Sequence, residues 1–416
     1  MIAKKEAGNM TLIECFTDSH MDNIAVCLGL RPEKLLLVGE KEAMRQPAEK
    51  YHDLLRQRGI ATKIVLSDVT GKDLAGIRSV FEKHLAEEAE CILDLTGGDE
   101  LVIMAAGAAL AGLDSRQRKA VRVQKFDYSQ GRILNCLHGN RPLPHMPGSL
   151  SIRELIWLSG GDILPDAWQP ATDSRPGELE GLWRIVAEDP KGWNRDIMVL
   201  NEFERRDNFG ETISLDLEKL QGDISHFSEK EEQVRTLLDK LHRRGIIDDR
   251  SSRNRLEYAY RSPLLRYCTL KAGNALEVKT LLEARAMQEN GHPFFGDSRM
   301  SVSIDWDGDL TAGAQHLPDT RNEIDVLLMH GNTPLFISCK NGTIGEEELY
   351  KLHTVAGRFG GPHARKMLIA TDLEQKSVAS NRSLVQRAWD MDIFLVTDAA
   401  ELSSADWKEL FRLAVQ

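Results

Sequence analysis

Apolar residues in the first 111 positions fall into short runs separated by longer segments of helical spacing. The runs of strand length are 11–16, 34–38, 62–66 and 91–95. The segments between them have the three-to-four-residue periodicity of helices, around 43–58, 73–87 and up to residue 111. Strands that alternate with helices predict an α/β domain built on a doubly wound parallel sheet.

Two polar loops follow strands of this predicted sheet, at the edge where such sheets bind ligands. The first loop contains Thr17, Asp18, Ser19 and His20, and the second contains Thr96, Gly97, Gly98, Asp99 and Glu100. Glycines at a strand-to-helix junction let backbone amides approach an anion, and the helix N-terminus favours negative charge. The second loop therefore has the features of a phosphate cradle. A Gly-Gly turn is about as often a tight connection only, and neither a Walker loop nor a GxGxxG pattern is present.

A different pattern, nearer the C-terminus, predicts a β-hairpin. Apolar runs at 322–328 and 334–340 flank the turn-prone pair Gly331-Asn332. The first run carries Asp325, and the second places Ser338 and Lys340 on one face of its strand. A carboxylate that holds a divalent cation beside a lysine that polarises water is suited to phosphodiester hydrolysis. The alternative is a solvated aspartate and an edge-strand lysine that discourages aggregation.

The segments around this hairpin extend the pattern. A helix from Gly273 to about Met287 carries Glu277, and the segment 301–306 has the composition of a strand. After the hairpin we expect a helix that begins near Glu346, a break at Gly360-Gly361 and a strand at 366–370. Glu347 and Lys351 of that helix either face the metal or the scissile phosphate or, as we expect, lie on a solvated charged face. The predicted order is helix, three strands, helix, strand.

The middle of the chain is less regular. Residues 234–241 have helical periodicity, and two polar, strand-like pieces follow around 255–260 and 265–270. Arg250, Arg253 and Arg255 form a basic turn before the first piece. A helix, a basic turn and a hairpin are also how a winged-helix domain ends, so this region is either a structural linker or a DNA-binding element.

Composition favours a multi-domain intracellular enzyme. The 416 residues are 42% hydrophobic and 28% charged, enough to bury several cores. The six cysteines form no CxxC pair, so we expect free thiols in a reducing compartment. No apolar run approaches ~18 residues and no secretory leader is apparent, so we expect a cytoplasmic protein without membrane contact. The net charge of −11 argues against nonspecific coating of nucleic acid.

The hairpin resembles the PD-(D/E)xK nuclease superfamily, in which an acid and an acid-x-Lys pair lie on adjacent strands. Ser338 stands where that pattern has its second acid, and serine is a poor metal ligand. The resemblance implies that Asp325, the backbone carbonyl of Cys339 and Glu277 bind Mg²⁺ or Mn²⁺. Lys340 then acts beside them, with Ser338 in the catalytic group.

The two halves together resemble the CARF-containing CRISPR ancillary nucleases, the dimeric kind with a single CARF domain. The resemblance rests on Thr-Gly-Gly after the fourth strand, the Glu-Ile-Asp and Ile-Ser-Cys-Lys strands, and Gly360-Gly361. It implies a CARF sensor at 1–165, a linker or winged-helix-like segment at 166–260, and an α/β/α restriction-endonuclease-like nuclease at 261–416.

The function that this resemblance implies is antiviral type III CRISPR defence. A homodimer would hold one cyclic tetraadenylate or hexaadenylate between its two loop pairs, at residues 17–20 and 96–100, and its nuclease domains would then cut single-stranded DNA, duplex DNA or RNA. The acidic pair Asp99-Glu100 departs from the basic character usual after Thr-Gly-Gly. Two alternatives remain: a CARF-controlled transcription regulator without nuclease activity, and a sensor that degrades its own ligand with help from His20 or Lys125.

Overall fold

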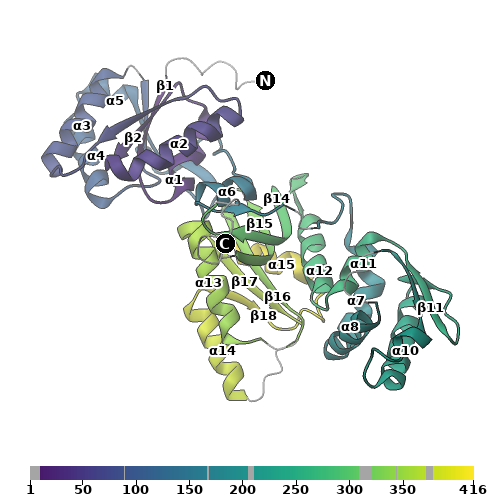
Figure 1. Cartoon of the computed structure of the whole chain (residues 1–416). Helices are drawn as coiled ribbons and strands as arrows, with labels where there is room; N and C mark the ends of the chain where they lie inside the picture. The colour runs from purple at the N-terminus through teal and green to yellow at the C-terminus, as the bar shows by residue number, and fades with distance from the viewer. Residues whose placement is uncertain are drawn as a thin grey trace.

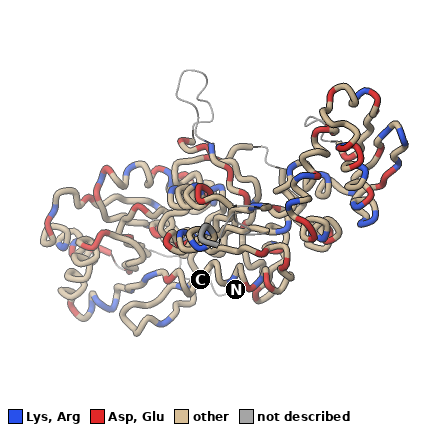
Figure 2. The backbone as a smooth tube through the Cα atoms, turned by 90° about the horizontal axis from the view of Figure 1, so that it is seen from below, with Lys and Arg blue, Asp and Glu red and all other residues tan. Residues whose placement is uncertain are grey.

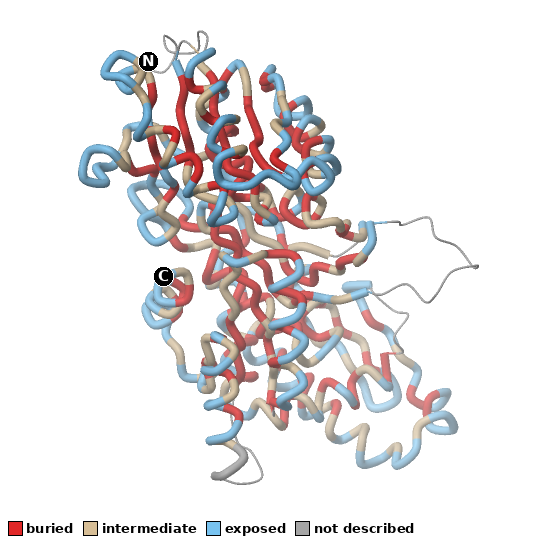
Figure 3. The backbone as a smooth tube through the Cα atoms, turned by 90° about the vertical axis from the view of Figure 1, so that its left-hand side faces the viewer, coloured by how far each residue is buried: buried red, intermediate tan, exposed pale blue. Residues whose placement is uncertain are grey.

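Two α/β domains and a smaller middle unit make up the protein (Figure 1). The structure is a computed structural model, and it describes residues 10–88, 90–165, 168–204, 210–308, 321–342, 344–371 and 378–416. Buried residues run through the strands of both large domains and through the region where they meet (Figure 3). Lysines and arginines are interspersed with acidic residues along the whole chain (Figure 2).

The N-terminal domain is the predicted doubly wound sheet. Its strand order is β3-β2-β1-β4-β5-β6-β7, in which β1 to β5 are parallel and the last two strands are antiparallel. The strands are β1 Met10–Cys15, β2 Lys34–Gly39, β3 Lys63–Asp68, β4 Glu90–Asp94, β5 Val121–Asp127, β6 Arg132–Asn135 and β7 Arg141–Pro142. The order reverses between β1 and β4, so the loops after these two strands lie at the switch point of the sheet.

Helices cover both faces of this sheet (Figure 1). The helices are α1 His20–Leu30, α2 Lys41–Gln57, α3 Leu74–Glu87, α4 Glu100–Gly112 and α5 Ser115–Ala120. Apolar residues of α1 and α2 pack in one core, and those of α3 and α4 pack in another on the opposite face. All four strand predictions and the helices between them are confirmed.

The C-terminal domain contains a six-stranded sheet of order β18-β17-β16-β15-β14-β8. The predicted hairpin is its centre, because β15 and β16 pair antiparallel around the turn Gly331-Asn332. The strands are β8 Asp162–Ile163, β14 Asp297–Asp305, β15 Arg321–His330, β16 Thr333–Lys340, β17 Arg365–Ala370 and β18 Ile393–Val396. β14 and β15 are antiparallel, whereas β16, β17 and β18 are parallel.

Helices again cover both faces, which gives the expected α/β/α layering. One face packs α12 Asn274–Arg285 and α15 Ser404–Val415, and the other packs α6 Ile152–Leu158, α13 Glu346–Gly360 and α14 Val378–Asp390. A short turn of helix, η2 Gly361–His363, follows α13, and a small ribbon joins β12 Gln288–Glu289 to β13 His292–Pro293. The predicted order of helix, three strands, helix and strand is confirmed in α12, β14, β15, β16, α13 and β17.

The middle unit (176–260) combines helices with a three-stranded sheet of order β10-β11-β9. Its elements are η1 Pro176–Leu179, α7 Glu180–Glu188, α8 Pro190–Glu204, β9 Thr212–Asp216, α9 Leu217–Leu220, α10 Phe227–Arg243, β10 Ile247–Asp249 and β11 Arg255–Tyr260. The helix at 234–241 and the strand at 255–260 are confirmed, but the hairpin differs from the prediction: β11 pairs with β10, on the other side of the basic turn, and not with 265–270. The unit shares one apolar core with the α12–α15 face of the C-terminal domain.

The predicted strand at 265–270 is wrong. This segment belongs to the helix α11 Pro263–Leu270. Ser262 caps the helix by accepting a hydrogen bond from the Leu265 amide, and Pro263 occupies the first turn, where a missing N–H costs nothing. Arg266 points from this helix into the middle unit, where it forms a buried ion pair with Glu204 at 2.6 Å.

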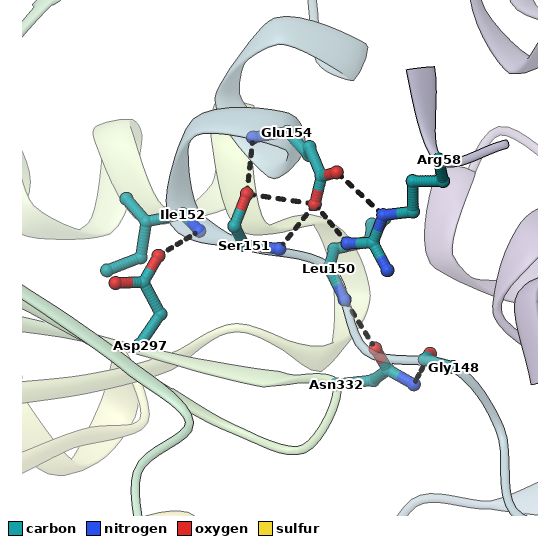
Figure 4. A network of polar contacts seen from close by, with 8 residues as sticks. All are labelled: Arg58, Gly148, Leu150, Ser151, Ile152, Glu154, Asp297 and Asn332. Carbon is teal, nitrogen blue, oxygen red and sulfur yellow. Dashed lines mark hydrogen bonds and ion pairs between the residues drawn. The ribbon is translucent and has the colours of Figure 1, made fainter. Parts of the chain in front are cut away.

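A polar network fixes the segment between the two large domains (Figure 4). The side chain of Asn332, at the hairpin turn, accepts from the Leu150 amide at 3.3 Å and donates to the Gly148 carbonyl at 2.9 Å. Ser151 and Glu154 form a capping box at the start of α6, and Glu154 also accepts from Arg58 at the end of α2. The connecting segment is therefore bonded to both domains.

Within the described residues, no helix combines the length and apolar character needed to cross a membrane.

We expect Asn332→Ala to lower the stability of the protein by about 1–3 kcal/mol, because it removes the partners of the buried Leu150 amide and the partly buried Gly148 carbonyl of the connecting segment. Asn332 is buried, so water cannot replace these two hydrogen bonds. The measurement is urea unfolding followed by circular dichroism. Asn254→Ala, in the exposed turn before β11, is the matched control, and an equal effect of the two substitutions would contradict the role of Asn332.

Candidate functional site

Asp325 lies where the pairing of β15 with β16 stops. The last paired residues are Val326 and Ile337, and beyond them the Asp325 side chain replaces the backbone ladder. Its Oδ2 atom accepts from the Cys339 amide at 2.6 Å and from the Ser338 hydroxyl at 3.1 Å. Oδ1 takes part in neither of these hydrogen bonds. The sheet thus holds the carboxylate in one orientation and leaves one of its oxygens available.

Lys340 completes the group at the end of β16. Its Nζ lies 3.5 Å from Asp325 Oδ2 and 3.2 Å from Glu348 Oε2 on α13. Burial lowers the pKa of Lys340, but the Asp325 and Glu348 carboxylates outweigh this effect and raise it above its usual value. Lys340 is therefore a cation at neutral pH, suited to stabilise negative charge rather than to accept a proton.

The strand beside Asp325 is also irregular. Ser301 of β14 has a positive φ of 47°, which non-glycine residues rarely adopt, and its pairing with Asp325 is missing from an otherwise continuous ladder. Met300 packs on the α12 face of the sheet, whereas Val302 packs on the α13 face. Such backbone strain costs on the order of 1–3 kcal/mol and concentrates at functional sites.

Glu277 enters the site from α12, as predicted. The Ser301 hydroxyl donates to its Oε2 at 3.3 Å, and the Tyr267 hydroxyl lies 3.0 Å from Ser301 Oγ. Burial, and then the charges of Asp325 and Glu323, raise the pKa of Glu277 to about 8. The effect of the Asp325 charge on Glu277 is consistent with the two carboxylates lying near each other.

The donors at this site fit a hard divalent cation. Asp325 and Glu277 supply carboxylate oxygens, and Mg²⁺ in proteins is usually held by one or two carboxylates, with water filling the other positions. The N–H and C=O of one residue in an extended strand point toward the same neighbour, so the Cys339 carbonyl also faces β15. Among the described residues, no three His, Cys, Asp or Glu side chains cluster closely enough to hold a metal ion by themselves.

The pattern of residues missed at this site is informative. The sequence marked none of three residues that act at this site. Glu348 forms an ion pair with Lys340, the Ser301 hydroxyl donates to Glu277, and the charge of Glu323 raises the pKa of Glu277. Glu347 and Lys351 are exposed, as expected, and it is their neighbour Glu348 that turns inward. A helical step of one residue rotates the side chain by about 100°, so spacing alone did not select Glu348 over Glu347.

The two loops of the N-terminal domain meet, as predicted from the sheet. A Cβ on Gly97 would lie 2.5 Å from Thr17 Cγ2, so the second loop approaches the first too closely for any side chain at this position. In the first loop, Ser19 caps α1, and Asn23 bonds both the amide and the carbonyl of Thr17. His20 Nδ1 lies 2.9 Å from the Tyr51 hydroxyl.

The polar groups of the second loop are mostly engaged. The Thr96 hydroxyl donates to Asp94 and accepts from the Phe126 amide at 2.7 Å. The Asp99 side chain caps α4 by accepting from the Leu101 amide at 2.9 Å, which turns its charge toward its own helix. Glu100 is exposed. Neither acidic side chain of this loop is therefore fixed over the glycines.

A cluster of acidic residues lies beneath these loops. Glu14 and Asp94 face each other across β1 and β4, and Glu14 is fully buried with no hydrogen bond to either carboxyl oxygen. Burial, and then the charges of Asp94 and Asp22, raise the pKa of Glu14 far above its usual value. Burial also raises the pKa of Asp94 to about 6, despite hydrogen bonds from Thr96 and Gln124. Burial and the two neighbouring carboxylates thus favour the neutral form of the Glu14 carboxyl.

Asp22 connects this cluster to the C-terminal domain. It accepts from the Tyr128 hydroxyl, and it lies 3.0 Å from His363 Nε2 in η2. The rings of Tyr128 and His363 stack with centroids 3.4 Å apart. His363, in the short helix after α13, therefore contacts the helix that follows the loop at 17–20, which the sequence did not predict because 341 positions separate Asp22 from His363.

The fold and the site define a class of protein: a doubly wound α/β domain joined to an α/β/α domain that carries an acid-and-lysine site at its hairpin.

Solved structures confirm this architecture. The chain is similar to VC1899 from Vibrio cholerae, with a TM-score of 0.68, 17% identity and 97% of each chain covered. It is also similar to Can2 from Sulfobacillus thermosulfidooxidans in complex with cyclic tetra-adenylate, with a TM-score of 0.63, 15% identity and 98% of each chain covered. The expected resemblance to CARF-containing ancillary nucleases is thereby confirmed for the fold. No protein-family model and no curated protein sequence matches the chain.

We expect metal-free wild-type protein to lose stability as the pH rises from about 4.5 to about 8, because over this range the folded protein keeps Glu277 protonated beside Asp325 while the unfolded chain releases the proton. The stability that protonated Glu277 contributes is fully present below the ordinary carboxyl pKa. It is lost as the pH rises through the raised pKa of Glu277, about 8. Glu277→Gln removes it, so the variant gains on the order of a few kcal/mol relative to wild type at pH 9. Urea unfolding in EDTA between pH 5 and 9 measures this difference.

Exposed Glu347→Gln is the control for this titration, and its stability should follow that of wild type at every pH. Parallel curves for wild type and Glu277→Gln would show that Glu277 is not titrating in this range.

Proposed function

We propose that this protein is a nuclease activated by a cyclic oligoadenylate and dependent on a divalent metal ion, acting in CRISPR defence. The observation that carries the proposal is the Asp325 carboxylate at the open end of the β15–β16 ladder, with Lys340 at 3.5 Å and Glu277 beside it. A carboxylate pair and a cationic lysine at one strand end are the groups that phosphodiester hydrolysis requires.

Each residue has a distinct role in this proposal. Asp325, Glu277 and the Cys339 carbonyl would hold Mg²⁺ or Mn²⁺, which supplies Lewis-acid activation when bound. Lys340 orients the attacking water and stabilises the negative charge that develops on the phosphate. Ser338 holds Asp325 in place through its hydroxyl, and Glu348 positions the Lys340 ammonium from α13. Serine at this position thus acts as a support for Asp325.

The ligand part of the proposal rests on the loops at the switch point and on Can2. The two loops, at 17–20 and 96–100, meet at the edge of the sheet where doubly wound folds bind ligands. Can2, which shares the fold over nearly its whole length, binds cyclic tetra-adenylate. We propose that a homodimer places two such loop pairs around one ring, since a two-fold axis presents identical groups to a symmetric ligand.

The test is cleavage of supercoiled plasmid, single-stranded DNA and RNA with Mn²⁺, with and without cyclic tetraadenylate or hexaadenylate. We expect cleavage only with an activator, and a loss of at least ~100-fold in Asp325→Ala and in Lys340→Ala, since each removes a group that acts on the transition state. Calorimetric titration should show that both variants still bind the activator.

Lys408→Ala on α15 is the matched control and should cut normally. Cleavage that survives in both Asp325→Ala and Lys340→Ala would show that the chemistry lies elsewhere. Binding of an activator without cleavage of any substrate would favour a regulator.

A second candidate, a ligand-controlled DNA-binding regulator, is favoured by the middle unit. α10 is followed by the β10–β11 hairpin, whose turn presents Arg250, Arg253 and Arg255 to solvent. Among the described residues, neither Arg250 nor Arg253 pairs with a carboxylate, so both are available for phosphates. The same surface would also serve a nuclease as a substrate contact.

We expect the double variant Arg250→Glu, Arg253→Glu to bind duplex DNA more weakly in EDTA. The slope of log affinity against log salt should fall by about 2, one unit for each arginine that no longer pairs with a phosphate. Fluorescence anisotropy measures both quantities. Arg184→Glu on α7 is the control, and unchanged binding by the double variant would remove the middle unit from consideration as a nucleic-acid surface.

A further inference from the structure

A cavity of about 460 Å³ opens where the two large domains meet. We call it the junction pocket. One wall belongs to the N-terminal domain and includes Asp18 and His20 of the first ligand loop and Lys50 of α2. The other wall belongs to the C-terminal domain and includes Trp306, Asp307 and Arg358. The pocket therefore continues from the ligand loop onto the nuclease-type domain.

Two cations from different domains converge on this pocket. Lys50 Nζ donates to the carbonyls of Trp157 and Leu158 at 2.8 and 3.2 Å, which fixes it at the wall. A Cβ on Gly160 would lie 3.2 Å from Arg358 Nη2, so the guanidinium packs directly over a glycine. In the part of the chain that the structure describes, neither cation forms an ion pair with a carboxylate.

The pKa values of Lys50 and His20 reflect burial and the closeness of the two cations. Burial and then the charge of Arg358 lower the pKa of Lys50. Burial, followed by the charge of Lys50, lowers the pKa of His20 to about 4, with Asp18 opposing and Arg358 adding to the effect. Asp18 and Asp307 also line the pocket, but neither forms an ion pair with Lys50 or Arg358 among the described residues, so the repulsion between the two cations costs free energy that a bound anion would recover.

Trp306 and Asp18, which also line the junction pocket, suit the base and ribose of a nucleotide. Trp306 is half-buried and packs edge-on against Phe359 with centroids 5.4 Å apart, which fixes its ring at the pocket. Tryptophan rings stack nucleobases, and a carboxylate such as Asp18 accepts from an exocyclic amine or a ribose hydroxyl. The volume lies within the range of small-molecule sites.

We infer that the junction pocket binds a phosphodiester of the activating cyclic oligoadenylate between Lys50 and Arg358, so that both domains hold the activator. This inference rests on the proposed function and specifies its regulation. Arg358 lies near the end of α13, and Glu348, ten residues earlier on the same helix, holds Lys340. At 1.5 Å per residue, about 15 Å of continuous helix separates the activator from the catalytic lysine.

The test is activator binding to full-length protein in a Lys340→Ala background, which prevents cleavage without touching the pocket. Isothermal titration with cyclic tetraadenylate and hexaadenylate should show about 10- to 100-fold weaker binding after Arg358→Ala, the loss expected for one charge-assisted hydrogen bond. Arg358→Lys should retain most of the affinity. Arg412→Ala on α15, on the opposite face of the sheet, should bind as the parent does.

Thermal unfolding without ligand shows whether each variant is folded, and the same scan with activator gives a second reading of binding. Equal affinity of folded Arg358→Ala and its parent would overturn the inference and leave the proposed function intact. If the parent binds neither ring, the proposed function fails, and this inference fails with it.

Discussion

One apolar core joins the two large domains, and the placement of both sites depends on it. Side chains of β1, α1 and α2 pack with those of α6, and through α6 with α13 and the neighbouring strands of the second sheet. Buried side chains of this kind are closely packed and leave little free space. A displacement of α1 or α2 therefore displaces α6 and α13 as well. The connecting segment and the contact between Asp22 and His363 cross the same boundary.

The helices and strands that could be predicted are those whose apolar residues recur at a regular spacing. Strands such as β2 and β16 are apolar runs, and helices such as α2 and α13 have one apolar face, so element type and order followed from periodicity. The hairpin could be predicted because Gly331-Asn332 separates two apolar runs. Asp325, Lys340 and Glu277 could be named because each lies within a regular element whose direction the pattern fixes.

The remaining features depend on contacts between distant positions. Ser301 leaves the regular strand conformation, and nothing in its local sequence marks a positive φ. Glu348 and Glu347 are equivalent in composition, and only the packing of α13 on the sheet distinguishes them. His363 reaches Asp22 across the domain boundary. The segment 265–270 is short and of mixed polarity, so its pattern does not separate a strand from a helix, and the cap by Ser262 stabilises the helix.

Cys339 has a consequence for how the catalytic strand can vary. Its thiol is buried against Thr280, and burial raises its pKa far above the usual value, so it takes no part as a thiolate. What the position contributes to the site is its backbone amide, which holds Asp325, and its backbone carbonyl. The packing against Thr280 limits the size of the side chain, and the amide excludes only proline. Another small side chain at this position would therefore leave Asp325 in the same orientation.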